Sequence, residues 1–203
     1  MTLDRLRPVA NKGLEPFVDL SVRLGLTPNA VSVLAIGVAL LAGGTFVLAG
    51  TDPVWYVAGA VLVFVNGWLD LIDGALARRL DVESRAGDFL DHVLDRYADI
   101  ALLAGLSAGV GRYALGFAAV TGVVMTSYLG TQAQAVDLDR VYGGLVGRAD
   151  RLALMGVGAT LAAVFPGPIR GMTVVGWLLA VFAVVGHVTA IQRFYYAYRA
   201  LTA

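Results

Sequence analysis

The chain has 203 residues, of which 58% are hydrophobic and only 15% are charged, whereas a soluble domain usually carries about 25% charged residues. A mean hydropathy of +0.75 excludes an ordinary soluble enzyme, because a compact water-soluble fold needs a polar surface. The 15 basic and 15 acidic residues balance and give no sign of nucleic-acid binding, while the absence of cysteine excludes disulfides, thiolate nucleophiles and Cys-ligated zinc. The composition therefore indicates a protein that lies in lipid.

The first 25 residues mix Leu, Val and Phe with charged residues and contain Pro8 and Pro16. This segment lacks the uninterrupted apolar stretch of a signal peptide, so we expect it to be retained. We predict a short interfacial helix on the cytoplasmic membrane face over residues 1–25. Thr27 and Pro28 then favour the start of the next helix, with Thr27 as N-cap and Pro28 at the first helical position.

Residues 26–203 are predicted to form an all-α bundle of six transmembrane helices within a single domain. A span needs about 20 mostly apolar residues. Five uncharged runs fit this requirement: 29–50, 53–69, 113–136, 152–169 and 171–192. A sixth span ends near Gly111 and reaches bilayer length only by extending back through Asp99, Asp95 and Asp91. By the same reasoning the second span continues past Asp70 to about Arg78.

Basic residues concentrate in alternate connections between these spans, and only Arg112 and Arg170 fall in the opposite ones. Positively charged connections stay on the cytoplasmic side of a membrane. We therefore expect a multi-pass protein of the cell membrane with both termini on the cytoplasmic side.

The acidic residues are concentrated in one place, since eight of the fifteen lie between Asp70 and Asp99. An acid inside a span costs at least about 2.5 kcal/mol and is kept mainly where it has a partner or a function. Asp70 and Asp73 are spaced i, i+3, and Asp91 and Asp95 are spaced i, i+4, so each pair shares one helix face. Two antiparallel helices joined by a short loop should bring these four carboxylates together at the cytoplasmic membrane edge.

Four carboxylates at one place repel one another unless cations neutralise them. Hard oxygen ligands without Cys or His favour Mg²⁺, Mn²⁺ or Ca²⁺, and two ions match the charge better than one. One alternative is an ion-pair network with the arginines at positions 78, 79, 85 and 96. Another is an ion-coupled transporter, although these acids gather at one edge and no second half of the chain repeats them.

The cluster belongs to a longer pattern, Asp70-x2-Asp73-Gly74-x2-Ala77-Arg78-x8-Gly87-x3-Asp91-x3-Asp95. In this form the chain resembles the CDP-alcohol phosphotransferase family, and the match is specific because it fixes eight identities. The resemblance implies a six-helix membrane fold, usually a homodimer. It also implies transfer of a phosphatidyl-type group from a CDP-linked lipid to a small polar alcohol, with release of CMP.

The resemblance further implies roles for individual residues. Asp70, Asp73 and Asp91 would hold a pair of divalent ions, Mg²⁺ or Mn²⁺, while Asp95 would both contact a metal and act as the general base. The residues implied to bind the nucleotide of the CDP-lipid are Pro28, Asn29, Ala30, Val31, Gly74, Ala77, Arg78, Ser84 and Gly87.

Features outside the signature resemble the branch that makes phosphatidylinositol phosphate or archaetidylinositol phosphate. The segment 147–152, Gly-Arg-Ala-Asp-Arg-Leu, is similar to that branch's Glu-Arg-Pro-Glu-Arg-Leu, and Gln192-Arg193 to the end of its last helix. This implies that Arg148, Arg151 and Arg193 bind the acceptor, a phosphorylated polyol such as inositol phosphate.

One departure from the branch concerns the fourth span, where Lys, Arg and Glu are replaced by Gly130, Gln132 and Gln134. The acceptor site is therefore less cationic than in the branch. Glycerol 3-phosphate and serine stay open as acceptors, and the lipid chains of the donor can be acyl or ether-linked.

Overall fold

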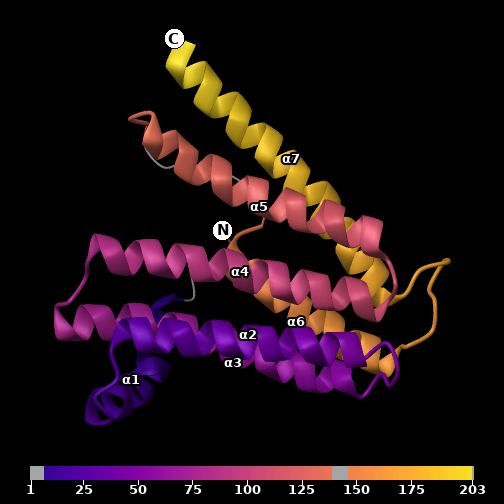
Figure 1. Ribbon diagram of the computed structural model, residues 1–203, viewed down its shortest axis with the longest axis horizontal. Helices are drawn as coiled ribbons and strands as arrows, with labels where there is room; N and C mark the ends of the chain where they lie inside the picture. The colour runs from indigo at the N-terminus through magenta and orange to yellow at the C-terminus, as the bar shows by residue number, and fades with distance from the viewer. Residues whose placement is uncertain (1–6, 139–145, 203) are drawn as a thin grey trace.

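The computed structural model describes residues 7–138 and 146–202, and its regular secondary structure in these ranges is helical. The helices, shown in Figure 1, are α1 (Arg7–Arg23), α2 (Pro28–Leu48), α3 (Trp55–Leu80), α4 (Arg85–Gly109), α5 (Tyr113–Ala135), α6 (Arg148–Val164) and α7 (Val174–Thr202). The predicted all-α fold is confirmed, and the predicted interfacial segment is described from Arg7 onward.

Helix α1 packs its inner face against α3. Leu14 and Val18 are buried in a small apolar cluster with Ile72 and Leu76 of α3, and the ring of Phe17 meets Trp68 edge-on at 5.5 Å between centroids. Among the other residues of α1 and just after it, the apolar Leu20, Val22 and Leu24 are exposed together with the charged Glu15, Asp19 and Arg23. A helix that presents both apolar and charged side chains to its surroundings suits the surface of a membrane.

Glycines bring the backbones of α2 and α4 into close contact. A Cβ added at Gly105 would overlap the backbone of Gly43, and one at Gly109 would overlap the carbonyl of Phe46. Beside this crossing lie the fully buried side chains of Phe46, Leu102 and Leu106. Small residues permit such close helix packing within membranes, so these glycines set the spacing between α2 and α4.

Helices α5 and α7 form a second closely packed pair, which diverges from α2, α3 and α4 at the end near the chain's C-terminus (Figure 1). A Cβ at Gly186 of α7 would overlap the backbone of Gly122 of α5. Four residues further along α5, the Thr126 hydroxyl donates to the Gly186 carbonyl at 2.8 Å. Helix α6 contacts both α3 and α7 and so joins the two groups of helices.

Several helix boundaries differ from the predicted ones. Helix α4 begins at Arg85 and so includes the expected extension back through Asp91, and the Ser84 side chain caps it by accepting from the Gly87 N–H at 3.0 Å. Helix α6 ends at Val164 because Pro166 and Pro168 follow it. Helix α7 continues to Thr202, beyond the predicted end at Gln192, because no helix-breaking residue intervenes.

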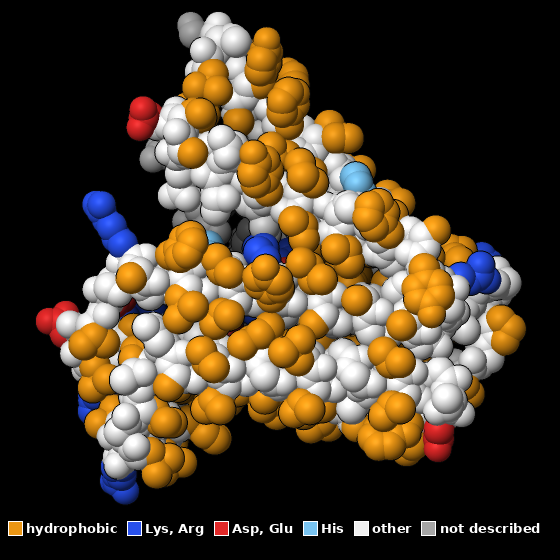
Figure 2. Space-filling model, viewed as in Figure 1, with side chains coloured by type: hydrophobic (Ala, Val, Ile, Leu, Met, Phe, Trp, Pro, Cys, Tyr) orange, Lys and Arg blue, Asp and Glu red, His pale blue; other side chains and the backbone are white. Residues whose placement is uncertain are grey.

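Four helices of the described residues are long and apolar enough to cross a membrane: α2, α3, α5 and α7. Figure 2 shows apolar side chains spread over one face of the molecule, with most of the visible charged side chains near its ends. Outward-facing apolar surface of this extent is typical of a protein surrounded by lipid. The molecule is therefore a helical membrane protein.

Candidate active site

Three carboxylates from two helices meet about two to three helical turns from the loop that joins α3 to α4. Asp70 lies on α3, while Asp91 and Asp95 lie one turn apart on α4, and each offers an oxygen within 4.8 Å of those of the other two. All three side chains are partly buried. The structure thus brings together three of the four carboxylates that the helix spacing predicts to converge.

Asp73, the fourth carboxylate, is buried and points toward α2. Its Oδ2 accepts a 2.6 Å hydrogen bond from the Ser32 hydroxyl, which also lies 3.2 Å from the carbonyl of Pro28. Asp73 is therefore not part of the closest group of three. Ser32 could not be identified from the sequence, because the two partners are 41 residues apart and no local pattern connects them.

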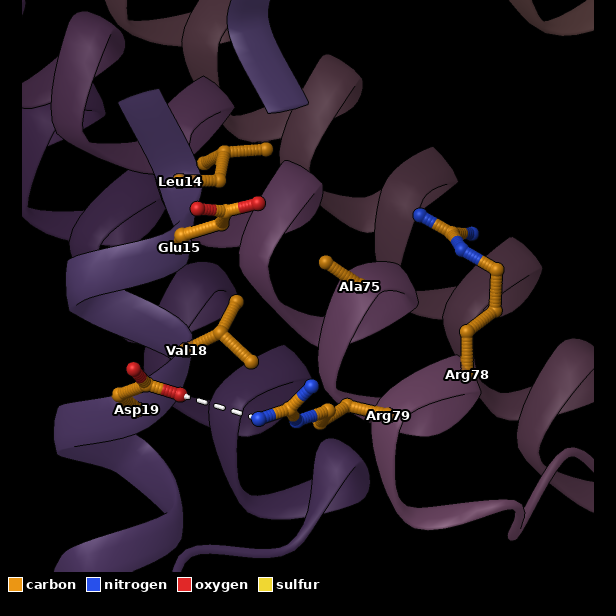
Figure 3. Close-up of a pocket in the computed structure, with 7 residues that line it drawn as sticks. All are labelled: Leu14, Glu15, Val18, Asp19, Ala75, Arg78 and Arg79. Carbon is orange, nitrogen blue, oxygen red and sulfur yellow. Dashed lines mark ion pairs between the residues drawn. The ribbon is translucent and has the colours of Figure 1, made fainter. Parts of the chain in front are cut away.

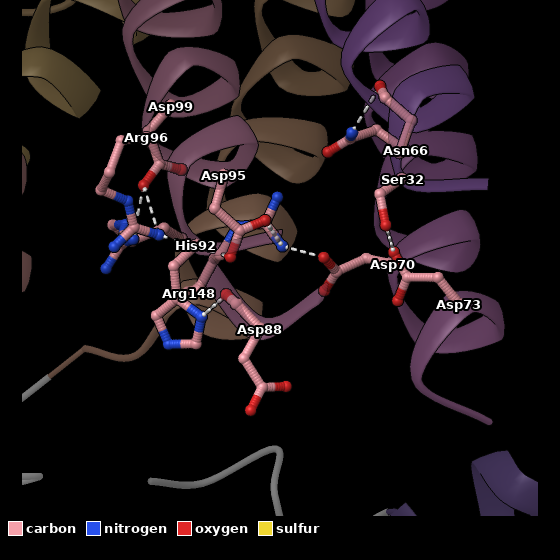
Figure 4. Close-up of polar contacts among 12 residues, drawn as sticks. Ser32, Asn66, Asp70, Asp73, Asp88, His92, Asp95, Arg96, Asp99 and Arg148 are labelled. Atoms are coloured by element: carbon pink, nitrogen blue, oxygen red, sulfur yellow. Dashed lines mark hydrogen bonds and ion pairs between the residues drawn. The ribbon is translucent and has the colours of Figure 1, made fainter. Parts of the chain in front are cut away.

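Arginines form ion pairs with several of these carboxylates, as Figure 4 shows. Arg148 at the start of α6 donates through Nη1 to Asp70 and lies 2.8 Å from Asp95 Oδ1. Arg96 Nη2 lies 3.5 Å from both Asp95 and Asp99. Arg151 then completes the series, 2.7 Å from Asp99 Oδ2.

These contacts form a continuous chain of alternating charges, which we call the charge ladder: Asp70, Arg148, Asp95, Arg96, Asp99 and Arg151. Its three carboxylates and three guanidinium groups balance formally. The predicted alternative of an ion-pair network thus holds for Arg96, which also donates to Ser127 of α5. Arg79 pairs instead with Asp19 of α1 at 3.7 Å, away from the ladder.

The three arginines predicted to bind the acceptor all lie inside the bundle. Arg148 and Arg151 are three residues apart on α6 and contact carboxylates of the ladder, and only 5% of Arg151 is exposed. Arg193 on α7 is also buried and donates to the backbone carbonyl of Thr126 at 2.6 Å. On α5, Gly130 is buried whereas Gln132 is exposed, as is Gln134.

The residues predicted to bind the nucleotide gather in two places. A Cβ at Gly87 would lie 3.2 Å from the Ser84 hydroxyl and 3.6 Å from Asn29 Oδ1, so the start of α2 meets the start of α4. A Cβ at Gly74 would lie 3.5 Å from a guanidinium nitrogen of Arg78. Among the others, Val31 is buried, and three are half-buried: Pro28, Ala30 and Ala77.

A cavity of about 490 Å³ lies between α1 and the end of α3. Figure 3 shows Arg78 on the α3 side of this cavity and the Asp19–Arg79 ion pair across it. Its other lining residues are Leu14, Glu15, Val18 and Ala75. Arg78 therefore both lines this cavity and reaches back toward Gly74.

The carboxylate group fits a divalent metal ion. Its donors are all carboxylate oxygens, the ligands that Mg²⁺ and Mn²⁺ prefer, and three of them are close enough to share one ion. A helical membrane protein with such a cluster between two adjacent helices has the donors of a divalent-cation site.

Residues 25–189 match the family model described as CDP-alcohol phosphatidyltransferase. The chain therefore belongs to the CDP-alcohol phosphatidyltransferase family and is an enzyme of that class. The resemblance expected from the Asp70–Asp95 signature is confirmed.

Curated relatives cover nearly the whole chain. The archaetidylinositol phosphate synthase of Pyrococcus horikoshii is 28% identical over 200 residues, which cover 98% of each protein. The phosphatidylinositol phosphate synthase of Mycolicibacterium smegmatis is 34% identical over 187 residues, covering 88% of this chain and 80% of the relative.

Solved structures show the same fold. The phosphatidylinositol phosphate synthase of Mycobacterium tuberculosis in complex with manganese and citrate gives a TM-score of 0.78 at 26% identity, covering 91% of this chain and 88% of that one. The same enzyme with CDP-DAG bound gives a TM-score of 0.77 at 26% identity, covering 91% of this chain and 93% of that one. The helix arrangement described above is thus shared with an enzyme that has been crystallised with manganese and citrate in one structure and with CDP-DAG in another.

Proposed function

We propose that this enzyme transfers a phosphatidyl-type group from a CDP-linked lipid to inositol phosphate and releases CMP in phospholipid biosynthesis. The observation that carries the proposal is the meeting of Asp70, Asp91 and Asp95 beside Arg148. It occurs in a chain similar over nearly its full length to synthases of archaetidylinositol phosphate and phosphatidylinositol phosphate.

Asp95 is the general base of this proposal. It would take the proton from the acceptor hydroxyl as that oxygen attacks the β-phosphorus, a role that requires hydrogen-bond reach of the reacting group. Asp70, Asp73, Asp91 and Asp95 would hold two ions, Mg²⁺ or Mn²⁺. When bound, such a pair neutralises the diphosphate and stabilises the attacking and leaving oxygens.

The nucleotide would lie where the starts of α2 and α4 meet the end of α3, against Pro28, Asn29, Ala30, Val31, Gly74, Ala77, Arg78, Ser84 and Gly87. Gly74 and Gly87 permit close approach of a ligand to the backbone, because they carry no side chain. Arg78 presents a planar fork of donors that matches a phosphate group, which a lysine would not reproduce.

Arg148, Arg151 and Arg193 would bind the acceptor. Three guanidinium groups on the inner faces of α6 and α7 favour an anionic substrate, since each charge-assisted hydrogen bond contributes roughly 1.5–3 kcal/mol. The alternative acceptors are glycerol 3-phosphate, which shares the phosphate, and serine, which the neutral Gly130, Gln132 and Gln134 would tolerate.

We also propose that the chain is a single domain of six spans, with residues 1–25 on the membrane surface and 26–203 forming the bundle. Helix α4 would be a span in addition to α2, α3, α5 and α7, because its charged residues pair inside the protein. Helix α6 would be another, since its 17 residues measure about 26 Å at 1.5 Å per residue. The positive-inside distribution supports a cytoplasmic active site and cytoplasmic termini, and the family resemblance supports a homodimer.

A CMP-release assay with purified enzyme and radiolabelled donor tests the proposal. Donors with diacylglycerol and archaeol chains would each be offered with inositol phosphate, glycerol 3-phosphate, serine and free inositol. We expect the fastest release with inositol phosphate and none from Asp95→Asn. Faster release with serine or free inositol would overturn the proposed acceptor, and no release with any pair would overturn the proposed reaction.

A further inference from the structure

Arg148 contacts two of the proposed metal ligands with a single nitrogen. Its Nη1 donates to Asp70 Oδ1 and lies 2.8 Å from Asp95 Oδ1. Figure 4 shows this guanidinium between the two carboxylates, which come from different helices. Arg148 therefore occupies the position from which one cation can neutralise both groups.

A divalent ion shared by Asp70 and Asp95 would compete with that nitrogen. Oxygen ligands approach Mg²⁺ at about 2.0–2.1 Å, whereas the guanidinium already lies at hydrogen-bond distance from the same two side chains. Two positive charges that close repel each other strongly in a partly buried site. The guanidinium and an ion that bridges these two Oδ1 atoms are therefore alternative partners for the carboxylates.

The charge ladder shows which arginine such an ion would release. Arg96 and Arg151 both contact Asp99, which lies outside the proposed metal ligands and keeps these two arginines paired. Within the described residues, the ion pairs of Arg148 are with Asp70 and Asp95. Arg148 is thus the arginine of the ladder that loses its carboxylate partners when metal binds.

The position of Arg148 also suits an anion. It is the first residue of α6, where free backbone N–H groups and the helix dipole favour negative charge. Its side chain is 16% exposed, so a ligand from solution can reach it. A guanidinium released at this place would find a phosphate group to be a suitable new partner.

We propose that Arg148 exchanges partners, neutralising Asp70 and Asp95 until a divalent cation binds there and then binding the phosphate of the acceptor. The inference rests on the proposed function, which assigns those aspartates to the metal. Metal and phosphate then assist each other's binding by the same factor, because coupling between two sites is reciprocal. The enzyme thereby holds its acceptor site closed until the metal site is filled.

The first test measures Mn²⁺ binding rather than activity. The free Mn²⁺ signal in electron paramagnetic resonance gives the dissociation constant for the full-length protein in detergent. We expect Arg148→Gln to bind Mn²⁺ at least about fivefold more tightly than the unaltered chain, because the competing cation is gone. Arg79→Gln is the matched control: it removes an arginine paired at the surface with Asp19, and its Mn²⁺ affinity should stay unchanged.

The sign of the effect distinguishes the possible outcomes. Equal or weaker Mn²⁺ binding by Arg148→Gln, beside normal binding by the unaltered chain, overturns the exchange and leaves the proposed function standing. No saturable Mn²⁺ binding by the unaltered chain overturns the exchange together with the metal site of the proposed function.

The second test needs no variant, and so it decides the matter even when Arg148→Gln does not fold. Inorganic phosphate is titrated calorimetrically into the unaltered chain with and without Mg²⁺, and the heat of phosphate mixing with Mg²⁺ alone is subtracted. We expect phosphate to bind at least about fivefold more tightly with Mg²⁺. An affinity that Mg²⁺ leaves unchanged overturns the exchange.

Discussion

The helices that carry the acids and those that carry the arginines differ in how their side chains reach the site. Asp70, Asp91 and Asp95 lie on α3 and α4, which are consecutive and joined by a loop of four residues, 81–84. Arg148 and Arg151 come from α6 and meet partners 78 and 52 residues away in the chain. One short loop therefore suffices to bring Asp70, Asp91 and Asp95 together, whereas the positions of the arginines depend on the packing of the whole bundle.

Removal of divalent cations should have the largest effect. We expect CMP release to fall to background in excess EDTA and to return with Mg²⁺ or Mn²⁺, because the carboxylates need a cation to hold a diphosphate. The measurement is a chelator titration followed by readdition of metal. Full activity in excess EDTA would show that the carboxylates act without a divalent cation.

Asp95→Asn should lower the turnover rate at least about a thousandfold, which is within the range that general-base catalysis contributes. Binding of the CDP-lipid should be largely kept. Single-turnover CMP release and equilibrium binding of the donor separate the two effects. Asp88→Asn is the control, since Asp88 is exposed in the first turn of the same helix and should leave the rate nearly unchanged. A near-normal rate for Asp95→Asn would assign the base elsewhere.

Arg151→Ala tests the arginine side. We expect the KM for a phosphorylated polyol to rise at least about tenfold, equivalent to roughly 1.4 kcal/mol, with the KM for CDP-lipid nearly unchanged. Arg112→Ala, in the loop between α4 and α5, should alter neither constant. A variant that merely loses stability, with both KM values intact, would show that the Asp99–Arg151 ion pair serves folding alone.

A smaller effect should come from the glycines that set the spacing of α2 and α4. Gly105→Ala would place a methyl group against the backbone of Gly43, and such overpacking typically costs about 1–3 kcal/mol. Gly37→Ala meets open space on α2 and should be neutral or slightly stabilising. Thermal unfolding in detergent compares the two, and equal melting temperatures would show that the crossing tolerates a wider spacing.

The smallest effect is expected for Ser32→Ala, which removes the hydroxyl that fixes Asp73. The metal concentration for half-maximal activity should rise a few-fold, because an Asp73 without its 2.6 Å hydrogen bond is less well oriented toward the site. Ser32→Thr restores the hydroxyl and should restore the metal dependence. A loss that Ser32→Thr does not rescue would point to packing against α2 instead.

Much of the arrangement of the carboxylates on α3 and α4 could be predicted from the sequence. The i, i+4 spacing of Asp91 and Asp95 and their separation from Asp70 by one turn-forming loop require a shared site whatever the rest of the bundle does. The pairing of Asp73 with Ser32 could not be predicted, because it depends on how α2 is rotated about its axis relative to α3. Asp99 is a similar case. Its spacing from Asp95 predicts its place one turn further along α4, but nothing in the local sequence predicts its contact with Arg151.

The sequence by itself determined the lipid environment, the helical class, the capped start of α2 and the signature from Asp70 to Asp95. These properties depend on composition and on contacts within one helix or across one loop, so local spacing encodes them. Only the tertiary structure decided that Arg148 lies between Asp70 and Asp95, that Asp99 holds Arg96 and Arg151, and that Asp73 faces Ser32. The physical reason is that the strength of an interaction between charges depends on distance and burial, and both are set by how helices distant in sequence pack together.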